Sequence, residues 1–193
     1  MLSISKDYSP PVSDRILDAA ASCVLSFGVE RVTLAEIARR AGVSRPTVYR
    51  RFPDTQSILA ALLTMRITHA LDDVPSRGVG REHVVARVVA VAERLRRDDV
   101  IMSVLHEAPA LAMVYLSERL GTSQQLLLDT VAGELKAAQD QGSVRPGDVR
   151  QLATMSLLIT QSTILSAQTV QPILHASALA VELAHSLNGY LKP

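Results

Sequence analysis

The amino-acid sequence predicts an all-α protein, and three observations support this prediction. The 193 residues are 48% hydrophobic and 20% charged, with only 3% aromatic residues, and a composition rich in Ala, Leu and Val favours helices. Apolar residues recur at helical spacing between good capping residues along most of the chain. No segment combines strand-like alternation with turn residues.

The first helix is expected after a flexible N-terminal arm. Residues 1–12 contain two prolines and show no periodicity, so they form the expected arm. Ser13 is a good N-cap, and one apolar stripe then runs over residues 16–27. Gly28 follows the stripe and is expected to end the helix.

Two shorter helices follow, joined by a turn. Thr33, with Glu36 three residues later, predicts a capping box for the second helix, which Gly42 ends. Ser44 caps a third helix, and Pro53 prevents its continuation. Helix, glycine turn and short helix together form the helix-turn-helix arrangement, and residues 13–53 are therefore expected to be one domain.

Positive charge is concentrated in the same segment. Residues 31–53 hold six arginines and one acid, a net charge of +5, on a chain whose net charge is +1. Such a block marks a polyanion site, although an isolated charge run is more often a solvated face. A short capped helix fits the DNA major groove. Arg45 could then reach a guanine edge or a phosphate, Thr47 and Tyr49 phosphate oxygens, and Arg50 and Arg51 would supply charge.

The run VTLAEIARRAGVSRPTVYRRFPDTQSIL resembles the DNA-binding signature of the tetracycline-repressor (TetR) family of bacterial regulators. The resemblance covers about residues 13–60 and implies that the helix after Ser44 is the recognition helix. Many relatives carry a lysine near the start of the next helix, where this chain has Asp54 to Ser57, so no lysine clamp on phosphate is expected there. The resemblance implies phosphate contacts at Thr33, Ser44, Thr47 and Tyr49, and positions near base edges for Arg45 and Pro46.

Residues 54–193 predict a larger helical domain. Asp98 or Asp99, Thr122 or Ser123, and Asp148 are the expected N-caps of three of its helices. Glycine, proline and aspartate mark the breaks between helices. The helices are expected at about 58–71, 82–97, 99–105, 109–120, 122–141, 148–168 and 177–191.

Residues 151–181 contain no Asp, Glu, Lys or Arg. Ser, Thr and Gln interrupt every window long enough to span a membrane, so no membrane segment is expected. A neutral helix of this kind favours burial on two faces, either against a second subunit or entirely within one chain. The TetR resemblance implies the former, a homodimer through helices near 148–168 and 177–191, and hence a near-palindromic operator of double-stranded DNA.

The resemblance also implies a small-molecule pocket between the middle helices. A mostly apolar pocket with few charges would suit a lipophilic or weakly polar effector. Adaptable or hydrogen-bonding side chains in this domain are the candidates, although a methionine at helical spacing is more often plain core. The candidate ligand-binding residues are Met102, His106, Met113, Tyr115, Met155 and Gln161.

No catalytic residue, cofactor or metal site is expected. Cys23 lies on the inward stripe of the first helix, which favours a buried and inert thiol. The five histidines do not pair at helical spacing, and no nucleotide-binding or hydrolase motif is present. A single cysteine and the lack of a signal peptide fit a reducing compartment, and the TetR resemblance implies a bacterial cytoplasmic protein associated with the nucleoid.

The expected function is that of a homodimeric, ligand-responsive transcriptional regulator, a repressor that a small molecule releases from its operator. The alternative is a helical interaction or architectural protein that kept the fold without ligand-controlled operator binding. A helical ligand-binding enzyme is the third hypothesis, but it lacks a catalytic constellation in the sequence.

Overall fold

The computed structural model describes residues 11–108 and 122–193. Within these ranges every regular element is a helix, which confirms the predicted fold class. Most of the expected arm, the expected helix at 109–120, and the candidates Met113 and Tyr115 lie outside the described residues.

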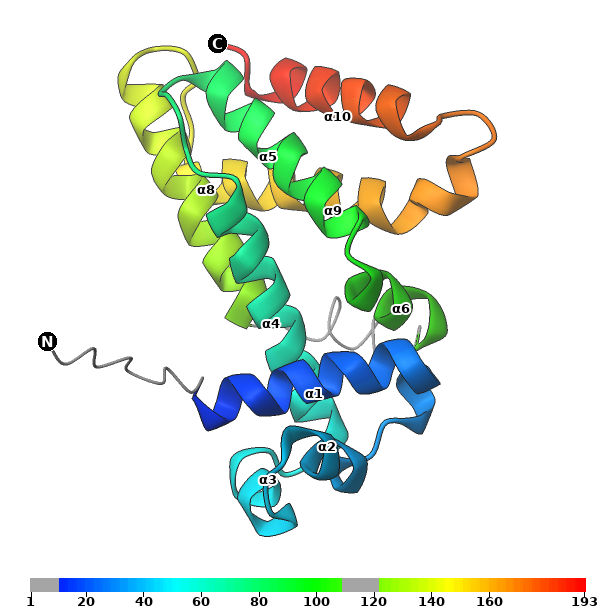
Figure 1. Cartoon of the computed structure of the whole chain (residues 1–193). Helices are drawn as coiled ribbons and strands as arrows, with labels where there is room; N and C mark the ends of the chain where they lie inside the picture. Colours follow the sequence, from blue (N-terminus) through cyan, green and yellow to red (C-terminus); the bar gives the residue numbers. More distant parts are fainter. Residues whose placement is uncertain (1–10, 109–121) are drawn as a thin grey trace, which may run out of the picture.

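Among the described residues, four elements form one end of the molecule and six helices form the body (Figure 1). The first group is α1 (Val12–Phe27), the short 3-10 helix η1 (Val29–Arg31), α2 (Leu34–Ala41) and α3 (Arg45–Arg51). The body comprises α4 (Thr55–Asp73), α5 (Arg81–Arg96), α6 (Asp99–Glu107), α8 (Thr122–Asp140), α9 (Val149–Val170) and α10 (Ala176–Leu191).

Side-chain caps begin most of these helices. The predicted caps Thr33, Ser44, Asp98 and Asp148 each accept a hydrogen bond from a backbone N–H of the helix that follows. The predicted cap Ser13 is wrong. Helix α1 already begins at Val12, after a proline whose fixed φ suits a helix start and which offers no capping oxygen.

Two apolar cores hold the fold together. The first joins α1, α2 and α3 to α4 and α6, and it includes the fully buried Ile16, Val48 and Ile58. The second joins α5, α8, α9 and α10, around Leu135 and Leu187. The expected domain boundary between residues 53 and 54 is therefore crossed by a continuous core, because α4 packs on α1 along its N-terminal half.

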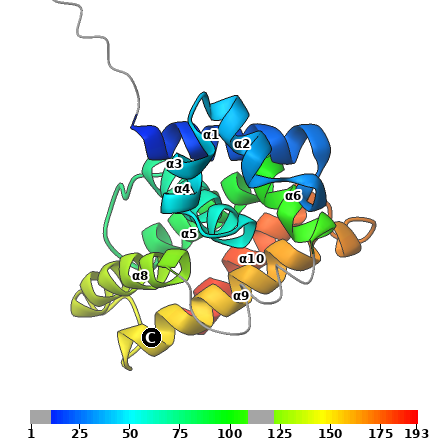
Figure 2. The same ribbon diagram turned by 90° about the horizontal axis from the view of Figure 1, so that it is seen from below.

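Helices α9 and α10 run side by side in opposite directions at the far end of the body (Figures 1 and 2). Helix α9 contains most of the charge-free stretch and has one face in the second core. None of the helices in the described ranges has the length and apolar character that a membrane span requires.

Candidate DNA interface and internal cavity

The turn between α2 and α3 is held by a glycine and by an arginine of α1. Gly42 adopts φ 63°, the left-handed conformation that ends α2, and the N–H of Val43 donates to the carbonyl of Ala38 (3.1 Å). The Arg15 guanidinium donates to the carbonyl of Ala41 at 2.6 Å. These bonds tie the turn to α1 and to the last turn of α2, and α3 packs on α2 directly after it.

Helix α3 has one buried side and one exposed side. Val48 is fully buried against the first core, whereas Tyr49, the next residue, is 53% exposed. Ser44 accepts from the N–H of Thr47 (3.3 Å), and the two hydroxyls are 2.8 Å apart. All eight sequence-predicted DNA-binding residues lie at the surface, with Thr47 half-buried and the other seven exposed.

The arginines of this region fall into two groups. Arg39 and Arg40 both bind Glu36, at 2.6 and 3.0 Å, and their hydrogen bonds lower the pKa of Glu36 to about 2. The other four, Arg31 before α2 and Arg45, Arg50 and Arg51 on α3, are exposed, and within the part of the chain that the structure describes their guanidinium groups form no hydrogen bond or ion pair. The three cations of α3 are available for a polyanion.

The start of α4 has the opposite charge. Asp54 accepts a hydrogen bond from the N–H of Ser57 at 2.7 Å, and the Ser57 hydroxyl accepts one from the N–H of Asp54 at 3.3 Å, which completes a capping box. Hydrogen bonds from Ser57 hold the pKa of Asp54 below its usual value. The Asp54 carboxylate therefore caps α4, and this position carries no lysine that could hold a phosphate.

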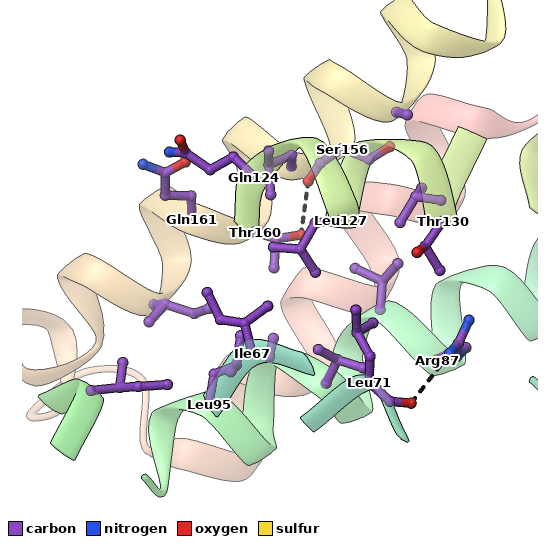
Figure 3. A pocket seen from close by; sticks show the side chains of 18 of the residues that line it. Ile67, Leu71, Arg87, Leu95, Gln124, Leu127, Thr130, Ser156, Thr160 and Gln161 are labelled. Carbon is purple, nitrogen blue, oxygen red and sulfur yellow. Dashed lines mark hydrogen bonds between the residues drawn. The ribbon is translucent and has the colours of Figure 1, made fainter. Parts of the chain in front are cut away.

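The body contains a partly open cavity of about 140 Å³ among α4, α5, α6, α8 and α9. Its wall is made mostly of Leu, Ile, Val and Ala side chains. In Figure 3, Ser156 and Thr160 of α9 lie in the wall, Gln124 and Gln161 lie together on one side, and Arg87 lies on the other. The cavity touches both α4, which begins beside α3, and α6, which packs on α1.

The sequence-predicted ligand residues are only partly brought together. Gln161 lines the cavity. Met102, His106 and Met155, all within the described ranges, are not among its lining residues. His106 is exposed on α6, and Met155 is exposed on the outer side of α9.

An ion pair in the cavity wall was not anticipated from the sequence. Arg87 of α5 pairs with Glu134 of α8, and both side chains are largely buried. The Arg87 guanidinium also donates to the backbone carbonyls of Val74 (2.7 Å) and Leu71 (3.3 Å), at the end of α4. The two charged residues are 47 positions apart, and no short motif joins them.

Glu107, the last residue of α6, was also missed as a functional candidate. Its carboxylate accepts a hydrogen bond from the backbone N–H of Val29 (3.1 Å), immediately after α1. Gly28 lies next to this carboxylate, and a Cβ on Gly28 would be 2.8 Å from the Glu107 carboxylate oxygen. The sequence signal was limited to Gly28, a glycine at a helix end.

Comparison with known proteins agrees with this arrangement. Residues 16–62 match the family model described as "Bacterial regulatory proteins, tetR family". The chain is 62% identical over 191 residues to the "Uncharacterized HTH-type transcriptional regulator Rv2250c" of Mycobacterium tuberculosis, and the match covers 99% of this chain and 100% of that protein.

Two solved structures share the fold. The transcriptional repressor QsdR of R. erythropolis, described as a TetR family protein, superposes with a TM-score of 0.66 at 18% identity, over 94% of this chain and 96% of that one. RolR, solved with the ligand resorcinol, superposes with a TM-score of 0.70 at 17% identity, over 94% and 87% of the two chains. The likeness extends beyond the N-terminal helices to the body that contains the cavity.

Proposed function

Since this chain belongs to the TetR family of bacterial transcriptional regulators, we propose that it is a homodimeric repressor released from its operator by a small molecule. The main support for the proposal is that shared helices connect the exposed face of α3 with the cavity. That face carries the three unpaired arginines. Helix α4 packs in the same core as α1, α2 and α3, and it also lines the cavity.

In the proposed complex, α3 enters the major groove of double-stranded DNA. Arg45, at the first position of α3, reaches a base edge, beside Pro46. Arg50 and Arg51, at the other end of the helix, neutralise phosphates. The remaining phosphate contacts come from hydroxyl groups on the exposed side, those of Thr33, Ser44, Thr47 and Tyr49.

The proposed dimer forms through α9 and α10. Met155, Leu158 and Leu165 are exposed along one side of α9, and Val181 is exposed on α10. A row of exposed apolar residues on adjacent helices marks an interaction surface. A second copy of the chain fits it because symmetric pairing of α9 and α10 would place two recognition helices on one duplex.

A pair of matched leucines tests the dimer. Leu158 on α9 is 54% exposed and Leu25 on α1 is 55% exposed. We expect Leu158→Glu to convert the dimer to a monomer, because it places a charge in the proposed interface, and Leu25→Glu to leave the dimer intact. Light scattering coupled to size exclusion measures the mass of each variant. Equal behaviour of the two variants, or a monomeric wild type, would contradict the assignment of α9 and α10.

The effector acts through the two helices that link the cavity to the DNA-binding end. Leu63 and Ile67 of α4, with Ile101 and Leu105 of α6, line the cavity, and Glu107 of α6 holds the end of α1. An effector that binds more tightly to the conformation in which α4 and α6 are further apart favours that conformation. In the dimer this changes the distance between the two recognition helices. DNA affinity then falls by the ratio of effector affinities for the two states.

The experiment is a selection from random duplexes followed by anisotropy titrations. We expect a near-palindromic site, whose affinity falls steeply with salt because phosphate contacts release counterions. We also expect an effector found by thermal-shift screening to weaken binding to that site. Equal affinity for the selected site and for random DNA at physiological salt would overturn operator recognition. An effector that stabilises the protein but leaves DNA affinity unchanged would overturn the ligand response.

A further inference from the structure

Polar side chains buried in this protein are concentrated on the cavity wall. Among the side chains that the structure describes, three polar ones are buried, Ser156 (2% exposed), Thr160 (7%) and Gln124 (5%), and all three line the cavity. Burial of a polar group is unfavourable unless it is hydrogen-bonded. Together with Thr130, Gln161, Arg87 and Glu134 they give a mostly apolar wall a polar part, which suits a ligand that carries a polar group.

The hydroxyl groups of the wall point their hydrogens away from the cavity. Thr160 donates to the carbonyl of Ser156 (2.8 Å), which Figure 3 marks, and Ser156 donates to that of Leu152 (2.9 Å). Thr130 of α8, also in the wall, donates to the carbonyl of Leu126 (2.8 Å). A hydroxyl has one hydrogen and two lone pairs. All three hydroxyls therefore offer a ligand lone pairs, that is, hydrogen-bond acceptors.

The described residues that line the cavity carry no net charge. Among them Arg87 and Glu134 are the charged ones, and they are paired with each other. Arg87 is held further by the two carbonyls at the end of α4. An anionic ligand would lose its hydration while meeting a cation already neutralised, beside a carboxylate that repels it. A neutral molecule meets neither penalty.

The volume of the cavity matches a small ligand. The cavity measures about 140 Å³, close to the ~150 Å³ of an engineered apolar cavity that holds benzene. One ring with a short substituent therefore fills this volume.

We propose that the cavity selects an uncharged, apolar molecule of about one ring that carries a hydrogen-bond donor, such as a hydroxyl group, directed at Thr160 and Ser156. This inference rests on the proposed effector site and adds the chemical class of the effector. Carboxylates of the same shape are excluded by Glu134, and isosteric hydrocarbons lose the hydrogen bond.

Three probes of one shape test the class on the full chain in the absence of DNA. They are para-ethylphenol, para-ethyltoluene and para-ethylbenzoate, measured by titration calorimetry or ligand-observed NMR at neutral pH. We expect the phenol to bind the wild type at least tenfold more tightly than the benzoate. Benzoate binding equal to or tighter than phenol binding would overturn the proposal, as would the failure of the phenol to bind at millimolar concentration.

A threonine pair identifies the acceptor. Thr160→Val keeps the side-chain volume and removes the lone pairs, so we expect phenol affinity to fall about 3- to 10-fold, with hydrocarbon affinity within twofold. Thr154→Val is the matched control. Thr154 makes the same bond to the preceding turn (2.7 Å) but is not among the cavity-lining residues of the described chain. Equal losses for phenol and hydrocarbon in Thr160→Val would overturn the directed hydrogen bond.

A change at Glu134 tests the role of the ion pair. Glu134→Gln leaves Arg87 without its counter-ion, so we expect para-ethylbenzoate to bind at least tenfold more tightly than to the wild type, while the phenol changes little. Melting curves verify that each variant is folded, and Ser156→Ala replaces Thr160→Val if the latter is not. An unchanged benzoate affinity in folded Glu134→Gln would overturn the role of the ion pair. Binding of the phenol without release of operator DNA would overturn the proposed function and leave the ligand class intact.

Discussion

The substitution Gly28→Ala tests the joint at which α6 meets the end of α1. Gly28 has φ 79° and ψ 158°, a region that costs any other residue about 1–3 kcal/mol. The new Cβ would lie 2.8 Å from the Glu107 carboxylate oxygen, which must move and give up the N–H of Val29. A hydrogen bond to a charged group contributes ~1.5–3 kcal/mol, and the exposure of Glu107 reduces this to about 1 kcal/mol. The expected loss is about 2–4 kcal/mol in the free energy of unfolding.

Thermal and urea unfolding at fixed protein concentration measure this loss, because dimer stability depends on concentration. For a chain of this length we expect the melting temperature to fall by about 5–15 °C. Gly133→Ala is the control, since Gly133 lies inside α8 with nothing within 4 Å of the added Cβ. It should raise the free energy of unfolding by about 0.5–1 kcal/mol, because alanine favours the helix.

Glu107→Ala separates the backbone strain at residue 28 from the clash with the Glu107 carboxylate. In the double variant with Gly28→Ala the clash is absent, so the two losses should sum to more than the loss of the double variant. Strict additivity would show that the carboxylate does not meet the added methyl group. A Gly28→Ala protein as stable as the wild type would refute the reasoning altogether, since the backbone conformation alone predicts a measurable loss.

Two further predictions concern the DNA-binding end. Arg45→Ala should weaken operator binding by about 1–3 kcal/mol and relax the preference at one base position. Arg50→Ala should weaken binding to all sequences equally and lower the slope of log affinity against log salt concentration by about 1. Anisotropy titrations against matched duplexes measure both effects. Arg39 and Arg40 depress the pKa of Glu36 from its usual value of 4.5 to about 2, so its contribution to stability is complete above pH 4.5 and is lost as the pH falls through 2. Urea midpoints across this range should therefore fall more steeply for the wild type than for Glu36→Gln, and parallel curves would contradict the pairing.

Local structure at the DNA-binding end was predictable because its determinants are close together in the sequence. Thr33 and Ser44 cap the helices that follow them, and Gly42 ends α2 in the left-handed conformation that its position indicated. The exposure of Tyr49 follows from the burial of Val48, since successive residues of a helix point in different directions. Arg45, three positions before Val48, is exposed as the first residue of the helix. Capping and periodicity act over three or four residues, and the sequence displays that range directly.

The cavity lining depends instead on how distant helices cross. Ser156 and Thr160 were visible only as polar interruptions of a neutral stretch, and Met155, the neighbour of Ser156, turns to the opposite side of α9. Which side of a helix faces a cavity is set by the packing of α4, α5, α6 and α8 around it, and apolar residues at helical spacing look alike in either position. The pairing of Arg87 with Glu134 is decided by that packing too.

The sequence by itself therefore determined the helices, most of their caps, the charged DNA-binding end and the family. Only the tertiary structure decided that Glu107 holds the end of α1 across 78 positions of sequence, and that the buried hydroxyls meet at one cavity. The physical reason is range: a helix and its cap are stabilised by neighbours along the chain, whereas a cavity and a joint between helices exist only after distant surfaces have packed.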